Sequence, residues 1–221
     1  MWKGIAERMK DIIIVCAGST AQEVYSVIDV INRDAVEKGK EPVYNIFGFI
    51  DDNPDTELAD FVKAPIIGSI KDWHPMGSEV YAMGNSSPKA KEKIVSVLKE
   101  RGCRFETIIA PYARVKPYVE IGEGCIITSY NINNGAKIGN FVNIQGSMIG
   151  GRTEIGDYST TLGFANVAQA KVGKRVYIGS HAVILGVNVE DDAFVCVGSI
   201  VVRKVKAGTK VFGNPAKRVD W

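Results

Sequence analysis

Aliphatic residues recur with a single period through the C-terminal half of the chain. Ile or Val stands every 17 residues, at positions 121, 138, 155, 172 and 189. Within each unit a second aliphatic position follows six residues on and a third eleven residues on, and Ile or Val fills thirteen of these fifteen positions. Spacings of 6, 5 and 6 fit neither a 3.6-residue helix nor a long alternating strand. They predict three short parallel strands per coil, each pointing one aliphatic side chain into the interior.

Glycine follows the first aliphatic residue in four of the five units, at positions 122, 139, 156 and 173. This placement is typical of a corner that needs a positive φ or a close approach of two backbones. Ile109 and Val115 extend the six-residue step backwards, so we expect the stack to begin near residue 109.

The third unit departs from the pattern because Thr161 and Asn166 occupy two of its interior positions. One explanation is a bulge that shifts the register, so that Leu162 and Val167 point inwards instead. The other is a polar site between subunits. The two explanations are compatible, since bulges often re-aim side chains beside active sites.

The N-terminal half shows a different pattern, in which strands and helices alternate. We expect strands over residues 11–17, 43–50 and 79–83, a turn with a helix cap at residues 18–20, and helices over residues 21–38 and 88–101. Such alternation favours a small parallel α/β domain. We therefore divide the chain into an α/β domain over residues 1–106 and a β domain over residues 107–221.

Composition narrows the class of protein. The chain has 221 residues, 46% of them hydrophobic, and a formal net charge of +2, which argues for neither a nucleic-acid partner nor a membrane surface. Its apolar stretches are too short for a membrane span, and residues 1–10 lack the apolar core of a signal peptide, so we expect a cytoplasmic protein. The four cysteines form no C-x-x-C pair and are expected to be buried thiols.

Polar residues follow the expected α/β strands, at the sheet edge where open α/β sheets bind ligands. They are Ser19, Thr20, Asp51, Asp52, Gly84 and Asn85. From the residues alone, an adjacent pair of carboxylates before Asn53-Pro54 is more typical of a turn cap than of a site. The loop after the first strand has one glycine where a dinucleotide fingerprint needs three, which disfavours hydride chemistry on NAD.

The C-terminal segment over residues 201–219 contains no acidic residue. Its basic residues are Arg203, Lys204, Lys206, Lys210, Lys217 and Arg218. This cluster is either a solvated face or a site for the phosphates of a ligand.

The 17-residue period is a hexapeptide-repeat pattern, and the chain resembles the left-handed β-helix acyltransferases. The segment Gly213-Asn214-Pro215-Ala216-Lys217 is similar to the closing motif of their acetyl-coenzyme A-dependent members. With the preceding α/β half, the layout resembles the sialic acid O-acetyltransferase family and the N-acetyltransferases that make bacillosamine and perosamine. The resemblance implies a small Rossmann-like parallel α/β domain followed by a left-handed parallel β-helix, assembled as a homotrimer.

The resemblance also implies binding roles. The uracil and ribose of a UDP-sugar would lie between the Asp51-Asp52 pair and the Gly84-Asn85 turn, with the loop at Ser19 and Thr20 facing the pyrophosphate. That loop is less similar, since the family usually has a glycine and a histidine there. Acetyl-coenzyme A would be the co-substrate. Its expected contacts are Gly179, Ser180 and Gly198 for the pantetheine arm, and Arg203, Lys204, Lys217 and Arg218 for the phosphates.

The histidine base of the resembled family is missing. That histidine and its acidic partner fall on Gly151 and Arg152, and a second family histidine, which contacts the acceptor, falls on Thr160. Shifting the alignment by one coil is no better, because the three family residues then fall on Asn134, Gly135 and Asn143. The remaining catalytic candidates are Thr160, Asn166 and His181, although His181 is better placed for a surface or subunit contact. With this one histidine in the repeats, we expect no metal site.

Without a histidine base, the acidity of the acceptor decides which group reacts. A sugar amine with a pKa of about 8 is partly neutral at pH 7 and attacks a thioester unaided, whereas a hydroxyl would forgo the roughly 10²- to 10⁴-fold that a base supplies. We therefore predict an acyl-coenzyme A-dependent N-acetyltransferase that acts on a nucleotide-linked amino sugar. The alternatives are a sugar O-acetyltransferase, a catalytically silent sugar-nucleotide-binding homologue and a structural trimer.

Overall fold

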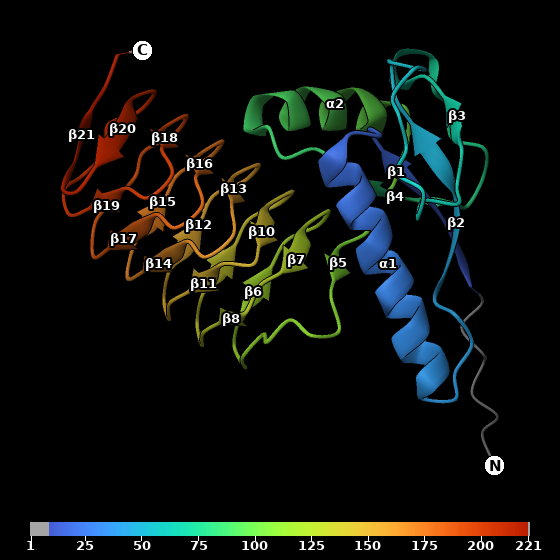
Figure 1. Ribbon diagram of the computed structural model, residues 1–221, viewed down its shortest axis with the longest axis horizontal. Coiled ribbons are helices and arrows are strands. Elements are labelled where there is room, and N and C mark those ends of the chain that lie inside the picture. Colours follow the sequence, from blue (N-terminus) through green and yellow to red (C-terminus); the bar gives the residue numbers. More distant parts are fainter. Residues whose placement is uncertain (1–8, 221) are drawn as a thin grey trace.

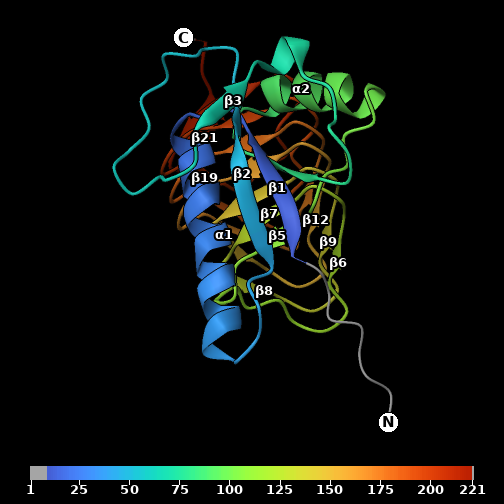
Figure 2. The same cartoon turned by 90° about the vertical axis from the view of Figure 1, so that its right-hand side faces the viewer.

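Two unlike parts follow one another along the chain, a small α/β part and a stack of short strands (Figure 1). The computed structural model describes residues 9–220, so the expectation for residues 1–10 lies almost wholly outside the described part. Figure 2 shows the sheet of the α/β part in front, with the stack of coils behind it. None of the helices in this range is long and apolar enough to cross a membrane.

The α/β part contains a four-stranded parallel sheet with the order β3-β2-β1-β4. Its strands are β1 (Lys10–Val15), β2 (Tyr44–Ile50), β3 (Ile66–Gly68) and β4 (Val80–Met83). The apolar run of β1 lies fully buried between β2 and β4, as a central parallel strand requires. The sequence pattern did not reveal β3, which is only three residues long.

Helices α1 (Ser19–Glu37) and α2 (Pro88–Glu100) follow β1 and β4, and a short 3₁₀ helix, η1 (Ile70–Asp72), follows β3. Both α-helices are followed closely by a glycine in the left-handed region, Gly39 with φ 72° and Gly102 with φ 91°. The N-cap of α1 lies within the expected residues 18–20, and the helix begins two residues earlier than expected. Gly18 is the N-cap residue, and it offers no side chain to the first turn.

The second part is a β-solenoid whose three faces are parallel sheets. The eight-stranded face comprises β5 (Ile108–Ile109), β7 (Ile126–Thr128), β10 (Asn143–Gln145), β13 (Thr160–Thr161), β16 (Tyr177–Ile178), β18 (Phe194–Val195), β20 (Lys210–Gly213) and β21 (Ala216–Arg218), of which β21 is antiparallel. The five-stranded face comprises β8 (Asn131–Ile132), β11 (Met148–Ile149), β14 (Asn166–Ala168), β17 (Val183–Leu185) and β19 (Ile200–Val201). The four-stranded face comprises β6 (Glu120–Ile121), β9 (Lys137–Ile138), β12 (Glu154–Ile155) and β15 (Lys171–Val172). The first strand, β5, confirms the expected start near residue 109.

The interior register changes in the third coil. Thr161 keeps its interior position and is fully buried, so the expected inward rotation of Leu162 is wrong. On the next face, however, Ile149 pairs with Val167, and the side chain of Asn166 points out into solvent. The extra residue lies between positions 161 and 167.

The shifted register persists in the later coils, where Ile184 and Val201 are buried in line with Val167. The expected interior positions Val183 and Ile200 are therefore wrong, and both side chains lie partly exposed. The periodicity concealed this shift because positions 183 and 184, like 200 and 201, are both aliphatic.

The repeated glycines serve close packing of successive coils. A Cβ on Gly139 would lie 2.5 Å from Asp157 Oδ1, and one on Gly156 would lie 2.6 Å from the carbonyl carbon of Gly173. The residues with positive φ stand two positions further on, for example Phe141 (55°) and Tyr158 (61°). Of the two reasons expected for glycine here, the close approach of two backbones is the one that applies.

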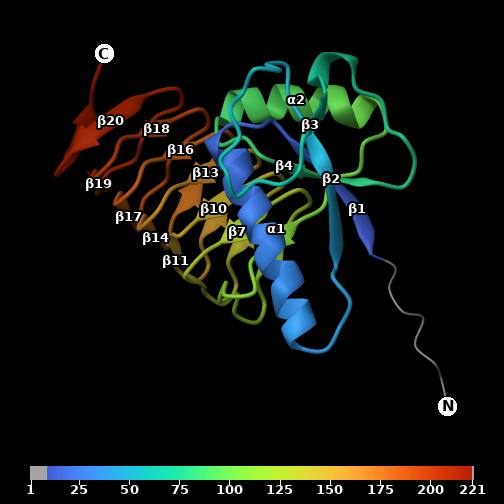
Figure 3. The ribbon, with the colours of Figure 1, turned by 45° about the vertical axis from the view of Figure 1, so that its right-hand side comes forward.

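The two parts share packed and charged contacts. Phe141 of the solenoid belongs to the core of the α/β part, and its ring meets that of Phe105 edge-on with centroids 5.1 Å apart. Helix α2 lies over the coils (Figure 3). Its Glu92 bonds Arg175 at 3.0 Å, and Arg175 in turn binds Asp192 through two nitrogens at 2.9 Å.

Candidate functional site

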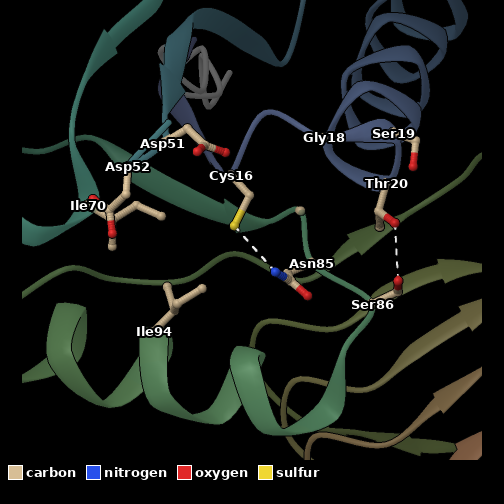
Figure 4. Close-up of a pocket in the computed structure, with 11 residues that line it drawn as sticks. Cys16, Gly18, Ser19, Thr20, Asp51, Asp52, Ile70, Asn85, Ser86 and Ile94 are labelled. Atoms are coloured by element: carbon tan, nitrogen blue, oxygen red, sulfur yellow. Dashed lines mark hydrogen bonds between the residues drawn. The ribbon is translucent and has the colours of Figure 1, made fainter. Parts of the chain in front are cut away.

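A cavity of about 370 Å³ opens where the ends of β1, β2 and β4 meet the start of α1 (Figure 4). All six residues predicted at the strand ends line this cavity: Ser19, Thr20, Asp51, Asp52, Gly84 and Asn85. The sequence did not reveal the other lining residues, Cys16, Gly18, Ile70, Ser86 and Ile94. Ile70 and Ile94 could not have been found by a search for polar strand ends, because they come from helices and are apolar.

The two carboxylates at the end of β2 have different local roles. Both oxygens of Asp51 accept backbone N–H bonds, from Ala17 at 2.7 Å and from Asn53 at 2.8 Å. Asp51 therefore ties the end of β1 to the turn after β2, which is the turn-capping role weighed from sequence.

Asp52 holds the opposite wall of the cavity. Its Oδ1 accepts the Ser69 hydroxyl at 2.8 Å and the Lys71 N–H at 2.9 Å. These bonds, led by the backbone N–H of Lys71, lower the pKa of Asp52, so the carboxylate is charged at neutral pH.

The loop after β4 forms the third wall. Asn85 donates to the sulfur of Cys16 at 3.6 Å, and Thr20 donates to the hydroxyl of Ser86 at 3.2 Å (Figure 4). Gly84 allows this approach, since a Cβ at this position would lie 2.5 Å from the Cβ of Ala21. The loop is thus held against both β1 and α1.

Cys16 contributes a neutral thiol to the cavity. Burial raises the pKa of this thiol to about 11, so it stays protonated at neutral pH. Its backbone has φ 71°, in the left-handed region that a non-glycine residue adopts at a cost.

The start of α1 gives the cavity a preference for anions. Gly18, Ser19 and Thr20 line the cavity, and no side chain caps the first turn of this 19-residue helix. The free N–H groups and the helix dipole at such an end favour a phosphate. With two hydroxyls beside this end and the charged Asp52 across the cavity, the walls suit a phosphate at one side and sugar hydroxyls at the other.

The predicted catalytic residues are not brought together in this cavity. Thr160 is fully buried on β13, whereas Asn166 is exposed on β14 of a different face. His181 is exposed at a corner with φ 59°, and its ring stacks on Phe164 with centroids 5.0 Å apart.

The positions expected for the family base line a second, open hollow. Gly151 and Arg152 border this hollow of about 680 Å³, together with Asn134 and Gln169. The nearby carboxylates have other partners, since Glu154 pairs with Lys171 and Asp157 with Lys174, both at 3.1 Å. Among the ion pairs of the described residues, neither carboxylate is paired with the neighbouring Arg152.

The residues predicted to meet coenzyme A gather toward the end of the solenoid that is remote from the α/β part (Figure 1). Gly198 has φ 67° and open space where a Cβ would stand. At Gly179 a Cβ would lie 2.7 Å from the backbone nitrogen of Val197, so close packing of the coils requires glycine there. Ser180 follows in the same corner. Lys204 pairs with Glu190 at 2.5 Å, and Arg218 pairs with Asp220 at 3.0 Å.

Arg203 and Lys217 are exposed at this same end of the solenoid, after β19 and on β21. Residues 9–220 contain no group of three His, Cys, Asp or Glu side chains that could hold a metal ion.

A parallel α/β unit with a strand-end cavity, joined to a triangular β-solenoid, is the class of architecture that these observations define. No family model matches the sequence, and no curated protein matches it. Solved structures match nearly the whole chain. WeeI from Acinetobacter baumannii is 24% identical, with a TM-score of 0.79 over 96% of this chain and 100% of that one.

Two further structures are similar. The acetyltransferase domain of PglB from Neisseria gonorrhoeae is 17% identical, with a TM-score of 0.78 over 95% of this chain and 100% of that one. A mutant of perosamine N-acetyltransferase from Caulobacter crescentus, solved in complex with coenzyme A and GDP-perosamine, is 19% identical, with a TM-score of 0.75 over 95% of this chain and 97% of that one. These likenesses show that the chain shares the fold of these proteins over at least 95% of its length.

Proposed function

We propose that this protein is an acyl-coenzyme A-dependent N-acetyltransferase that acts on a nucleotide-linked amino sugar. The observation that supports this most strongly is the cavity of the α/β part, whose polar walls are the six residues predicted for the nucleotide. The shared fold with proteins named as sugar N-acetyltransferases or acetyltransferase domains supports the same activity.

In this proposal the cavity binds the nucleotide end of the acceptor. The diphosphate lies at the start of α1, where the uncapped N–H groups and the hydroxyls of Ser19 and Thr20 donate hydrogen bonds. Asp52 accepts from a hydroxyl or ring N–H of the nucleoside, and Asn85 bonds its far side. The sugar then extends from the cavity toward the solenoid.

Acetyl-coenzyme A binds along the solenoid, with its phosphates at the basic C-terminal end and its thioester toward the sugar. Arg203 and Lys217 are the cations best placed to meet the phosphates, because Lys204 and Arg218 already pair with carboxylates. Gly198 and Ser180 border the path of the pantetheine arm.

The reaction needs no histidine base when the acceptor is an amine. The neutral amine attacks the thioester carbonyl and forms the new carbon–nitrogen bond, and the carbon–sulfur bond breaks. The proton lost by the nascent ammonium passes through solvent or a nearby carboxylate to the sulfur, so coenzyme A leaves as the thiol. A hydroxyl acceptor would need a base at the position of Gly151.

The proposal includes a homotrimer in the cytoplasm, with a left-handed solenoid and a Rossmann-like α/β domain over residues 1–106. The support for assembly is an apolar stretch on and beside the five-stranded face. Met148 (47% exposed), Phe164 (60%) and Leu185 (57%) lie there. Exposed apolar surface of this kind is typical of an interface between chains.

The test combines binding with turnover. We expect Asp52→Ala to weaken binding of the preferred nucleoside diphosphate by about 1.5 to 3 kcal/mol in calorimetry, because a charged hydrogen bond is lost. Asp55→Ala is the matched control, since Asp55 is an exposed carboxylate of the same turn that does not line the cavity. Thiol release from acetyl-coenzyme A in the presence of UDP-, GDP- or dTDP-linked amino sugars completes the test. Equal nucleotide affinity of Asp52→Ala and wild type would contradict the nucleotide site.

A second function, a silent sugar-nucleotide-binding protein, is favoured by one observation, the absence of histidine at Gly151 and Thr160. It predicts the same nucleotide binding without thiol release.

A further inference from the structure

A lysine is buried at the junction of the two parts, directly behind the third wall of the cavity. Lys91 is 0% exposed and belongs to α2, which begins three residues before it. The sequence gives no sign of this, because Lys91 stands between the exposed Lys89 and Lys93.

The ammonium group of Lys91 meets three neutral acceptors on the solenoid. Its Nζ donates to Asn143 Oδ1, to the Ser159 carbonyl and to Thr160 Oγ1, each at 3.2 Å. A protonated lysine has three N–H donors, so all three are used, whereas a neutral amine has two and would leave one of these three bonds unmade.

Two of these acceptor residues also form hydrogen bonds to the cavity wall. Thr160 donates its hydroxyl to the Ser86 carbonyl at 2.8 Å, and Asn143 donates its amide to the Asn85 carbonyl at 3.2 Å. Asn85 and Ser86 both line the cavity. Lys91 thus lies at the centre of a network that ends on the backbone of the binding site.

We propose that Lys91 is a positioning residue of the nucleotide site, which in its protonated form fixes the loop at Asn85 and Ser86 against the solenoid through Asn143 and Thr160. This role rests on the proposed function only for its effect on nucleotide affinity. The effect of Lys91 on the order of the loop can be measured by hydrogen exchange without a ligand.

The charge of Lys91 is sensitive to pH in the neutral range. Burial lowers the pKa of Lys91 to about 7, and Cys125 is the titratable group that faces it. Burial raises the pKa of Cys125 to about 11, so this thiol is neutral wherever Lys91 titrates. Loss of the proton from Lys91 removes one donor from the network while α2 stays packed on the solenoid. We therefore expect the loop alone to loosen as the pH rises through this range, although the folded state as a whole gains stability.

The decisive variant is Lys91→Met, which keeps the length of the side chain and removes its donors. Lys93→Met is the matched control, an exposed lysine of the same helix. Hydrogen exchange reports on the loop through the amides of Gly84 and Ser87, which bond the Val15 carbonyl and Asn85 Oδ1. We expect these amides to exchange at least tenfold faster in Lys91→Met and at the wild-type rate in Lys93→Met.

Thr160→Val keeps the inference testable if Lys91→Met does not fold. It removes one link at nearly constant shape, and we expect the amides of Gly84 and Ser87 to exchange about fivefold faster, the effect of one neutral hydrogen bond. In the wild type, exchange corrected for its intrinsic pH dependence should accelerate between pH 6.5 and 8.5.

Affinity supplies the second readout, with UDP, GDP and dTDP as the probes. For whichever diphosphate binds, we expect the dissociation constant to rise about tenfold in Lys91→Met and to lose its pH dependence near neutrality. If no diphosphate binds the wild type, the proposed function fails while the exchange result still decides the role of Lys91. Unchanged exchange in folded Lys91→Met and Thr160→Val, or the same pH dependence in Lys91→Met, would overturn the inference.

Discussion

In the solenoid the coils bury an aliphatic side chain at nearly every interior position, with Thr161 as an exception, whereas each strand of the α/β sheet ends in a different loop. The solenoid corners repeat one contact, in which a side-chain oxygen accepts an N–H from the preceding coil, as Asp157 does from Asn140. In the cavity of the α/β part, by contrast, each polar side chain has different hydrogen-bond partners and a different role. The repeated coils therefore form a regular core, and the candidate site lies in the α/β part, whose loops do not repeat.

The largest effect should come from breaking the repeated core. We expect Ile144→Ala to lower the free energy of unfolding by about 2 to 5 kcal/mol, because Ile144 is fully buried between two coils. Ile109→Ala is the matched control in β5, the first strand of the same face, where the side chain is 40% exposed. Equal losses in urea denaturation would show that burial in the stack does not set stability.

The contribution of the junction between the two regions to the free energy of unfolding should depend on pH. The pKa of Lys91 is about 7 in the folded protein and about 10.4 in an unfolded chain. Between these values the unfolded state binds more protons, so the contribution of Lys91 to the free energy of unfolding rises with pH, by up to about 1.4 kcal/mol per pH unit.

Comparison with Lys91→Met isolates this effect. The stability difference between wild type and variant should shift in favour of the wild type by about 2 to 3 kcal/mol between pH 7.5 and 9.5. Lys93→Met should follow the wild type. A pH-independent difference for Lys91→Met would mean that the lysine does not change its charge in this range.

Adding a methyl group should destabilise the protein more at the closely packed cavity than at a solenoid corner with open space. We expect Gly84→Ala to cost about 1 to 3 kcal/mol and to abolish nucleotide binding, since its Cβ would meet Ala21 and the Val15 carbonyl. Gly163→Ala provides the comparison, because nothing lies within 4 Å of its ideal Cβ. Calorimetric unfolding that gave the same loss for both variants would contradict the packing at the cavity.

The smallest effect is a gain. The hydroxyl of Thr161 is one of two buried side-chain polar atoms in the described range without a hydrogen-bond partner. Thr161→Val restores the aliphatic pattern at equal shape and should raise the free energy of unfolding by about 1 kcal/mol. Thr153→Val, which removes a hydroxyl that donates to the Val167 carbonyl, should not stabilise the protein.

The sequence predicted the solenoid closely because one period repeats, and it predicted the cavity because the carboxyl ends of parallel strands meet at one edge. One of the two explanations offered for the third coil, a bulge that turns Val167 inwards, is confirmed, although Leu162 does not turn with it. The sequence did not reveal that the shift persists, because adjacent aliphatic residues in the later coils make two registers look alike. It also missed Lys91, since only the packing of α2 on the solenoid distinguishes this lysine from its exposed neighbours. Contacts between distant segments leave no periodic signal.

The central claim is acetyl transfer to an amine held by its nucleotide, and competition between two matched acceptors tests it most directly. Purified protein is given acetyl-coenzyme A with a nucleotide-linked amino sugar and the corresponding hydroxy sugar nucleotide, and the products are analysed by mass spectrometry. We predict one acetyl group on the amine and none on the hydroxyl, with product formation strongly reduced in Asp52→Ala and unchanged in Asp55→Ala. Acetylation of the hydroxyl, or bound nucleotide without any acetylated product across UDP-, GDP- and dTDP-linked acceptors, would contradict the account.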